Sequence, residues 1–124
     1  MNKREQGALG ERVAEEYLVK RGMELLARNL RYPIGEVDLV MRDGKYTVFV
    51  EVKRRGGTRY GIGREAVTLS KRKRISAVAL RYLLARNSLG TPVRFDIVEI
   101  AGGEVKHLPN AFSYTPPARG KGFF

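Results

Sequence analysis

Apolar and polar residues alternate along this chain with two different periods, and each period predicts a different element. Apolar side chains three and four positions apart predict helices at residues 5–21 and 69–86. The apolar faces are Leu9, Val13, Ala14, Tyr17 and Leu18 in the first helix, and Ile75, Val78, Ala79, Tyr82 and Leu83 in the second. Gly22 suits the position just past the first helix, where a left-handed backbone ends many helices.

Shorter segments rich in β-branched and aromatic residues predict strands. The segments are residues 23–30, 36–42, 46–53, 93–100 and 104–108. The run Asp43-Gly44-Lys45 predicts a hairpin between the second and third strands, with Asp43-Gly44 as its turn.

The predicted element order is α-β-β-β-α-β-β, which indicates an α/β fold. A long helix between the third and fourth strands permits a parallel crossover, so a mixed sheet with helices packed on it is expected. A chain of 124 residues suits one domain. We assign the domain to residues 1–109 and expect residues 110–124, which contain Pro116-Pro117, to form a poorly ordered tail.

The charge of the chain narrows the choice of partner. The net charge is +11, which implies an acidic partner, with nucleic acid first and an anionic membrane surface second. Residues 1–53 hold 10 basic and 9 acidic residues, whereas residues 54–124 hold 14 basic and 4 acidic residues. The acids are therefore concentrated in the half that carries the candidate site.

The residues that are missing exclude several classes of site. With no cysteine, disulfides and thiolate zinc sites are excluded, which leaves oxygen ligands for any metal. No segment approaches the ~20 apolar residues of a membrane span. The N-terminus also lacks the apolar run of a secretory signal, so a cytoplasmic protein without a membrane partner is expected.

Two acids and a lysine are predicted to meet on neighbouring strands. Glu51 and Lys53 lie two positions apart on the third strand and share a face, as Glu36 and Asp38 do on the second. Paired residues across the hairpin are expected to have numbers that sum to about 87 or 88. This register puts Asp38 nearly opposite Val50 and Glu51, with Lys53 one pair nearer the open end of the hairpin.

The apolar run around Glu51 makes its burial costly unless the carboxylate is paired or binds a ligand. Two carboxylates and a substrate phosphate suit Mg²⁺ or Mn²⁺, and Lys53 would then stabilise developing charge or orient a water molecule. The alternative is a plain ladder of ion pairs on a solvated sheet edge, with Glu36 as an ordinary surface partner.

Basic residues surround this candidate site. The glycine-rich segment 54–65 and the start of the second helix supply cations for phosphate contacts. The candidates for nucleic-acid binding are Arg54, Arg55, Arg59, Arg64, Lys71, Arg72 and Arg74. The ring of Tyr60 could stack on an unpaired base or cover the core. Lys71 could point toward the site or extend along the apolar face with its ammonium in solvent. The arginines of segment 54–65 could instead belong to a solvated loop that binds nothing. His107 is expected at the surface, and Asp96 is expected to pair with an arginine.

Several sequence runs together resemble a known family. GALGERVAEEYLVKRG, RNLRYPIGEVDLV, VFVEVKRR, AVTLSKRKRI and RFDIVEI resemble the YraN family of bacterial proteins, and GEVDLV with VFVEVKRR resembles the PD-(D/E)xK nuclease signature. The resemblance implies a restriction-endonuclease-like, three-layer α-β-α fold similar to Holliday-junction resolvases. It also implies that Asp38, Glu51 and Glu11 bind metal and that all three act in catalysis with Lys53.

The match departs from the nuclease pattern at two places. Gly35-Glu36 stands where the motif's name places a proline, and the second helix lacks the glutamine of some resolvases, with Lys71 nearby. Glu11 borders the apolar face of the first helix between Gly7 and Ala14, although an ordinary surface glutamate would fit there too.

The leading hypothesis is therefore a Mg²⁺-dependent endonuclease for DNA rather than RNA, with branched DNA as a candidate substrate. The alternative is a non-catalytic DNA- or RNA-binding module on a nuclease-like scaffold. A basic protein for membranes or acidic partners ranks last, because no amphipathic lipid-binding helix is found. The resemblance also leaves a homodimer open, since resolvases cleave paired sites as dimers.

Overall fold

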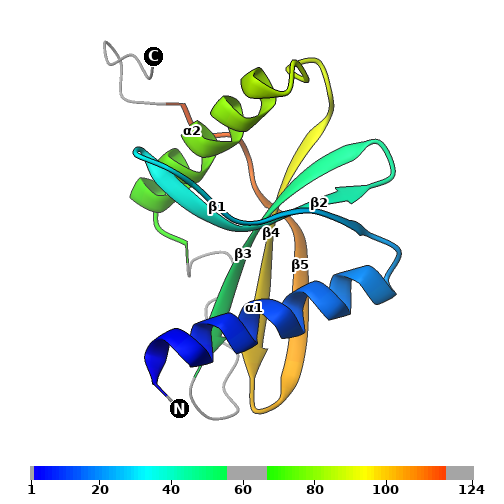
Figure 1. The fold of residues 1–124 in the computed structure, drawn as a ribbon, viewed down its shortest axis with the longest axis vertical. Helices are drawn as coiled ribbons and strands as arrows, with labels where there is room; N and C mark the ends of the chain where they lie inside the picture. The colour runs from blue at the N-terminus through cyan, green and yellow to red at the C-terminus, as the bar shows by residue number, and fades with distance from the viewer. Residues whose placement is uncertain (1, 56–66, 117–124) are drawn as a thin grey trace.

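The computed structural model describes residues 2–55 and 67–116 (Figure 1). Its elements are α1 (Lys3–Lys20), β1 (Glu24–Tyr32), β2 (Gly35–Asp43), β3 (Tyr46–Arg55), α2 (Leu69–Ala85), β4 (Val93–Ala101) and β5 (Glu104–Phe112). The predicted α/β class and the element order are thus confirmed. No helix in the described ranges is long and apolar enough to cross a membrane.

The five strands form one mixed sheet in the order β1-β2-β3-β4-β5. Neighbouring strands are antiparallel except β3 and β4, which are parallel. The chain passes through α2 between these two strands, as expected for a parallel connection. The strand that carries Glu51 is therefore the central strand of the sheet.

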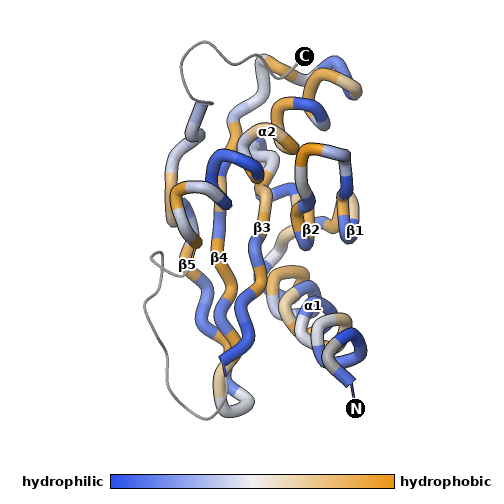
Figure 2. Tube along the Cα trace, turned by 90° about the vertical axis from the view of Figure 1, so that its left-hand side faces the viewer, coloured by the Kyte–Doolittle hydropathy of each residue, from blue (hydrophilic) through white to orange (hydrophobic). Residues whose placement is uncertain are grey.

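The two helices cover different faces of the sheet. Successive residues of β3 alternate: Phe49 packs in a cluster with side chains of α2, whereas Val48 and Val50 pack in a cluster with side chains of α1. Figure 2 shows hydrophobic residues recurring along β3 and β4 between the two helices. The predicted apolar face of α2 is fully buried, whereas in α1 only Ala14 and Leu18 are, and Leu9 is exposed.

The N-terminal ends of both helices are capped by polar side chains. The Asn2 side chain accepts a hydrogen bond from the Glu5 N–H at 2.8 Å, and the Thr68 hydroxyl accepts one from the Lys71 N–H at 3.2 Å. Gly22, with φ of +97°, follows the end of α1 as predicted. The Thr68 cap fixes Lys71 in the first turn of α2.

The hairpin between β2 and β3 differs from the prediction. Its turn is Gly44-Lys45, not Asp43-Gly44, because Asp43 pairs with Tyr46 and its carboxylate binds Arg94 at 2.9 Å. The pairs Leu39–Val50 and Val40–Phe49 show that the register lies one residue beyond the larger predicted sum. This shift moves Asp38 closer to Glu51 than the sequence indicated.

Two strands are longer than predicted. β3 continues through Arg55, so Arg54 and Arg55 belong to the strand and not to the loop that follows it. β5 was expected to end at residue 108 but continues to Phe112, whose ring stacks on Phe95 with centroids 5.2 Å apart. Residues 110–112, assigned from the sequence to the tail, therefore lie in the sheet.

The expectation that His107 lies at the surface is wrong. Its side chain is 9% exposed, and its Nε2 atom lies 2.7 Å from the Asp96 carboxylate. Asp96 also pairs with Arg94, as expected. Burial alone would raise the pKa of Asp96, but hydrogen bonds from His107, Arg94 and the Asn110 N–H lower it below its ordinary value.

Candidate metal and nucleic-acid site

Asp38 and Glu51 meet where the regular pairing of β2 and β3 ends. The final regular pair is Leu39 with Val50, so the next residues outward are Asp38 and Glu51. The Asp38 carboxylate accepts a hydrogen bond from the Val52 N–H at 2.8 Å. This bond ties the side chain to β3 and holds it close to Glu51.

The two carboxyl groups interact strongly. Burial raises the pKa of Asp38 to about 8, and the Glu51 charge and a hydrogen bond with Glu51 act in the same direction. The bond from the Val52 N–H opposes this change but does not reverse it. Near neutral pH, Asp38 is therefore largely protonated in the metal-free protein.

Glu51 is surrounded by two lysines. Its side chain is 3% exposed, and its Oε2 atom lies 2.5 Å from Nζ of Lys71 and 3.8 Å from Nζ of Lys53. The contact between Glu51 and Lys71 is an ion pair, because Oε2 of Glu51 accepts no hydrogen bond of good geometry within the described ranges. Of the two readings of Lys71, the structure favours the one that points it at the site.

The charge on Lys71 depends on the acids around it. Burial alone would lower the pKa of the Lys71 ammonium, but the Glu51 carboxylate and the charge near Asp38 raise it. Lys71 is therefore a permanent cation that partly neutralises Glu51. The sequence indicated Lys53 as the main lysine of this site, yet Lys71 lies closer to the carboxylate.

Glu11 reaches the same group of acids from α1. Burial raises the pKa of Glu11, and repulsion from Glu36 and Glu51 adds to this, whereas the polar groups of Asn29 and Asp38 lower the pKa without reversing the shift. A cavity of about 450 Å³ opens beside it. The lining residues are Gln6, Gly7, Glu11, Asp38, Val52, Arg54 and Arg55.

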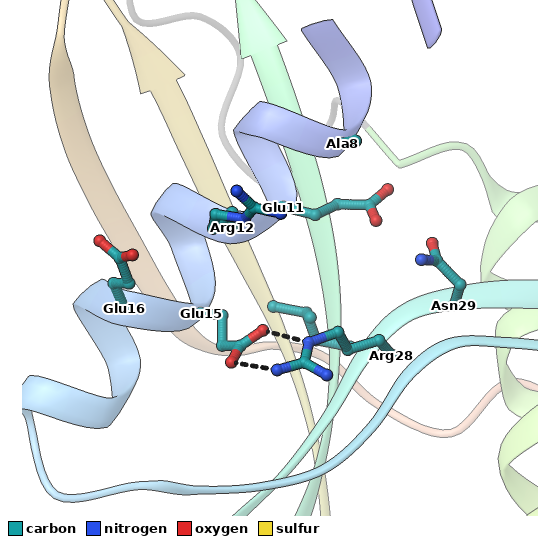
Figure 3. Close-up of a pocket in the computed structure, with 8 residues that line it drawn as sticks. Ala8, Glu11, Arg12, Glu15, Glu16, Arg28 and Asn29 are labelled. Atoms are coloured by element: carbon teal, nitrogen blue, oxygen red, sulfur yellow. Dashed lines mark hydrogen bonds and ion pairs between the residues drawn. The ribbon is translucent and has the colours of Figure 1, made fainter. Parts of the chain in front are cut away.

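A second cavity, of about 550 Å³, lies on the other side of Glu11. Figure 3 shows the carboxylate of Glu15 bound through both oxygens to the guanidinium of Arg28, at 2.7 and 2.9 Å. In the same view, Asn29 and Glu11 extend into the space beyond this ion pair. Glu11 therefore separates a cavity closed by an ion pair from a cavity that contains Asp38.

The donor atoms at this site fit a hard divalent cation. Asp38, Glu51 and Glu11 offer only oxygen ligands, and Oε2 of Glu51 has no well-directed donor among the described residues. Within the same residues, no three acidic, histidine or cysteine side chains form a group that could hold a metal ion by themselves. An ion such as Mg²⁺, which keeps several waters and binds substrate phosphate, suits such an open set.

Two arginines of β3 lie along the cavity that contains Asp38. The Arg54 guanidinium donates to the Gln6 carbonyl at 2.6 Å, and its stem crosses α1 at Gly10, where a Cβ would come within 2.6 Å of it. The Nε and Nη2 atoms of Arg55 are buried without a hydrogen-bond partner in the described ranges. Arg55 is thus a half-buried cation beside the acids.

The other basic candidates differ in their surroundings. Arg72 donates to the Val67 carbonyl at 2.9 Å and lies over the Phe112 ring, so its guanidinium supports the fold. Arg74 is exposed next to Gly35, on the side of α2 near β2. Glu36, weighed as a further ligand, instead forms an ion pair with Arg31 at 2.9 Å. Arg59, Tyr60 and Arg64 lie outside the described residues.

Asn29 is a site residue that the sequence analysis missed. It lines a cavity together with Glu11 and has a left-handed backbone, with φ of +49°. Asparagine is enriched in this conformation, but it is equally common in turns, so the residue type alone gave no sufficient signal.

Comparison with known proteins assigns the family. The profile of the uncharacterised protein family UPF0102 matches residues 10–100, a range that includes Glu11, Asp38, Glu51, Lys53 and Lys71. The chain belongs to UPF0102. This assignment confirms the resemblance to the YraN family, which is the same group of proteins.

Relatives of this UPF0102 protein occur in distant bacteria. A UPF0102 protein of Clostridioides difficile is 40% identical over 114 residues, which cover 90% of this chain and all of the relative. One of Symbiobacterium thermophilum is 46% identical over 97 residues, covering 78% of this chain and 82% of the relative. One of Rhodococcus opacus is 44% identical over 111 residues, covering 86% and 94%.

Proposed function

We propose that this UPF0102 protein is a metal-dependent endonuclease that hydrolyses phosphodiester bonds in DNA, with branched DNA as a candidate substrate. The observation that supports this most is the contact between the Asp38 and Glu51 carboxyl groups, with the Glu51 oxygen 2.5 Å from Lys71. Burying two acids together is costly, and a divalent cation between them would remove most of that cost.

In this proposal, each side chain of the site has a separate role. Asp38, Glu51 and Glu11 would hold Mg²⁺ or Mn²⁺ through their oxygens. When bound, such an ion neutralises phosphate charge and makes a coordinated water more acidic. Lys53 would orient the attacking water or stabilise the charge that develops on the phosphate, and Lys71 would hold the Glu51 side chain through their ion pair.

The basic residues would supply the DNA contacts. Arg54 and Arg74 are exposed close to the same end of the sheet, and Arg55 lies beside the acids with its Nε and Nη2 atoms buried. Guanidinium groups suit phosphate oxygens because they donate two parallel hydrogen bonds. The net charge of +11 would attract DNA to this face from a distance.

The direct test is cleavage of plasmid and four-way-junction DNA in the presence of Mg²⁺ or Mn²⁺. We expect Asp38→Asn to reduce the cleavage rate by at least about 100-fold, because it removes a negatively charged ligand without changing the shape of the side chain. Glu36→Gln is the matched control, since Glu36 lies two residues away on β2 and pairs with Arg31. Equal cleavage by the wild type and Asp38→Asn would refute the proposal.

A second candidate function is a non-catalytic DNA- or RNA-binding module. It is favoured by the Lys71 contact, since that ammonium already compensates Glu51 without a metal ion. This function predicts salt-sensitive binding, no cleavage with either metal, and no Mn²⁺ uptake in a calorimetric titration. Mn²⁺ uptake that Asp38→Asn abolishes would exclude it in favour of the endonuclease.

A further inference from the structure

The ammonium of Lys71 lies where a cation bound by Glu51 would have to lie. Its Nζ atom is 2.5 Å from Oε2 of Glu51, whereas Nζ of Lys53 is 3.8 Å from the same oxygen. A hard divalent ion bound to a carboxylate oxygen lies about 2.0–2.6 Å from it. The Lys71 ammonium and such an ion would therefore approach one oxygen to a similar distance, and their like charges repel at this range.

The contact between Lys71 and Glu51 depends on charge and not on direction. The Glu51 side chain is only 3% exposed, yet its Oε2 atom accepts no hydrogen bond of good geometry within the described ranges. A lysine ammonium is a compact point charge on a flexible stem, so it can neutralise a carboxylate without aligning a donor on it. The oxygen therefore keeps its lone pairs for a ligand that approaches along them.

Of these two side chains, Lys71 is the one that can move. Glu51 is buried on β3, the central strand of the sheet, and is held between β2 and β4. The Lys71 side chain is 36% exposed and extends from the first turn of α2. Rotation about its four-carbon stem can carry the ammonium into solvent while α2 stays in place.

The start of α2 is an unfavourable place for a cation. Its first turn contains no acidic residue, and the run from Lys71 to Arg74 is basic throughout. The helix dipole adds partial positive charge at this end and so disfavours an ammonium there. Within the described ranges, Glu51 is the acid that forms an ion pair with Lys71, and this pair offsets the repulsion.

We propose that Lys71 is a tethered counter-ion of the metal site, which occupies the cation position beside Glu51 in the metal-free protein and leaves it when Glu51 and Asp38 bind a divalent ion. Glu51 then has a positive partner in both states. The ion pair does not exclude a metal but lowers the affinity for it, because Lys71 has to be displaced. This inference rests on the proposed function, since it assumes that the acids bind a cation.

The test is a calorimetric titration of Mn²⁺ into the wild type and two variants of Lys71. Lys71→Gln removes the competing charge but keeps an amide donor for Glu51. We expect it to lower the Mn²⁺ Kd by about tenfold, because no ammonium has to be displaced. Lys71→Arg keeps the charge, so it should bind Mn²⁺ no more tightly than the wild type does.

Lys73→Gln is the matched control. It removes the same charge from the same helix, two residues further along. Because a helix turns by about 100° per residue, Lys73 projects from the other side of α2. Its charge is then screened from the site by salt, and the Mn²⁺ Kd should stay within about twofold of the wild-type value.

Thermal unfolding provides a second measurement. In EDTA, Lys71→Gln leaves the buried Glu51 without its closest cation, so Tm should fall by about 5 °C. Saturating Mn²⁺ should restore most of this loss, so that Mn²⁺ raises Tm more in the variant than in the wild type. A variant that folds only with Mn²⁺ would support the inference in the same way.

The outcomes separate the inference from the proposed function. An unchanged or higher Mn²⁺ Kd in Lys71→Gln would overturn the inference and leave the endonuclease proposal intact. Equal tightening in Lys73→Gln, or tighter binding by Lys71→Arg, would also overturn it, because affinity would then not depend on a charge at this position. A wild type that takes up no Mn²⁺ would overturn both.

Discussion

Asp38 is a carboxyl group that the fold keeps protonated to an unusually high pH. Its pKa is raised from an ordinary value of 3.8 to about 8, first by burial and then by Glu51. Between these two values, the folded protein binds a proton that the unfolded chain releases. Stability that depends on this proton is therefore fully present below about pH 4 and is lost as the pH rises toward about 8.

This sign gives a prediction for Asp38→Asn, which cannot ionise. In EDTA at pH 8, the variant should have a higher free energy of unfolding than the wild type, by up to a few kcal/mol. The two proteins should converge below about pH 3, where Asp38 is largely protonated in both the folded and the unfolded state. Urea unfolding at several pH values measures this, with Glu36→Gln as the exposed control. A difference that does not change with pH would contradict the prediction.

The sequence alone predicted some residues of the site but not others. Asp38, Glu51 and Lys53 could be predicted to converge, because strand alternation and a short hairpin fix their faces. The place of Lys71 could not, because it depends on the start of α2 at the Thr68 cap and on how that turn packs near Glu51. Asn29 was missed because a single interrupted position inside a strand leaves no periodic signal.

At the scale of elements, the hydrophobic pattern predicted the helices and strands and their order well. The errors lie at their ends. The fifth strand was predicted to end at residue 108, but β5 continues to Phe112 with a register shift between Phe95 and Ile97 and a left-handed Asn110, with φ of +52°. Similarly, the Asp43 pairing with Arg94, a distant residue on β4, decided which two residues formed the turn.

The extension of β5 predicts which part of the C-terminal segment supports the fold. Phe112 is 7% exposed and stacks on Phe95, so Phe112→Ala should lower the free energy of unfolding by about 3 kcal/mol. Tyr114, which is 46% exposed, is the control, and Tyr114→Ala should change stability by less than about 0.5 kcal/mol. Equal effects of the two variants in urea unfolding would show that β5 is not packed as described.

At the scale of the whole molecule, acidic and basic residues are distributed unevenly along the chain. The acids are concentrated in the first half of the chain, and the net charge of +11 comes almost entirely from the second. Under the proposed function, a small cluster of acids within a basic protein would bring a divalent cation and DNA to the same place.

This distribution predicts a steep salt dependence of DNA affinity. Each arginine that contacts a phosphate adds about 0.9 to the slope of log K against log salt concentration. Arg74→Ala should therefore lower the slope by about one, as measured by fluorescence anisotropy with labelled DNA. Arg86→Ala is the control, because Arg86 follows the far end of α2 and lies over the Tyr82 ring. An unchanged slope in Arg74→Ala would remove that residue from the DNA contacts.

The most direct measurement is anomalous X-ray scattering from crystals soaked in Mn²⁺. We predict an anomalous peak in contact with both the Asp38 and Glu51 carboxylates, with the Glu11 side chain turned toward it, and no such peak in Asp38→Asn. Ordered, ion-free carboxylates in wild-type crystals soaked with saturating Mn²⁺ would contradict the metal site, and with it the proposal that this UPF0102 protein is a metal-dependent nuclease.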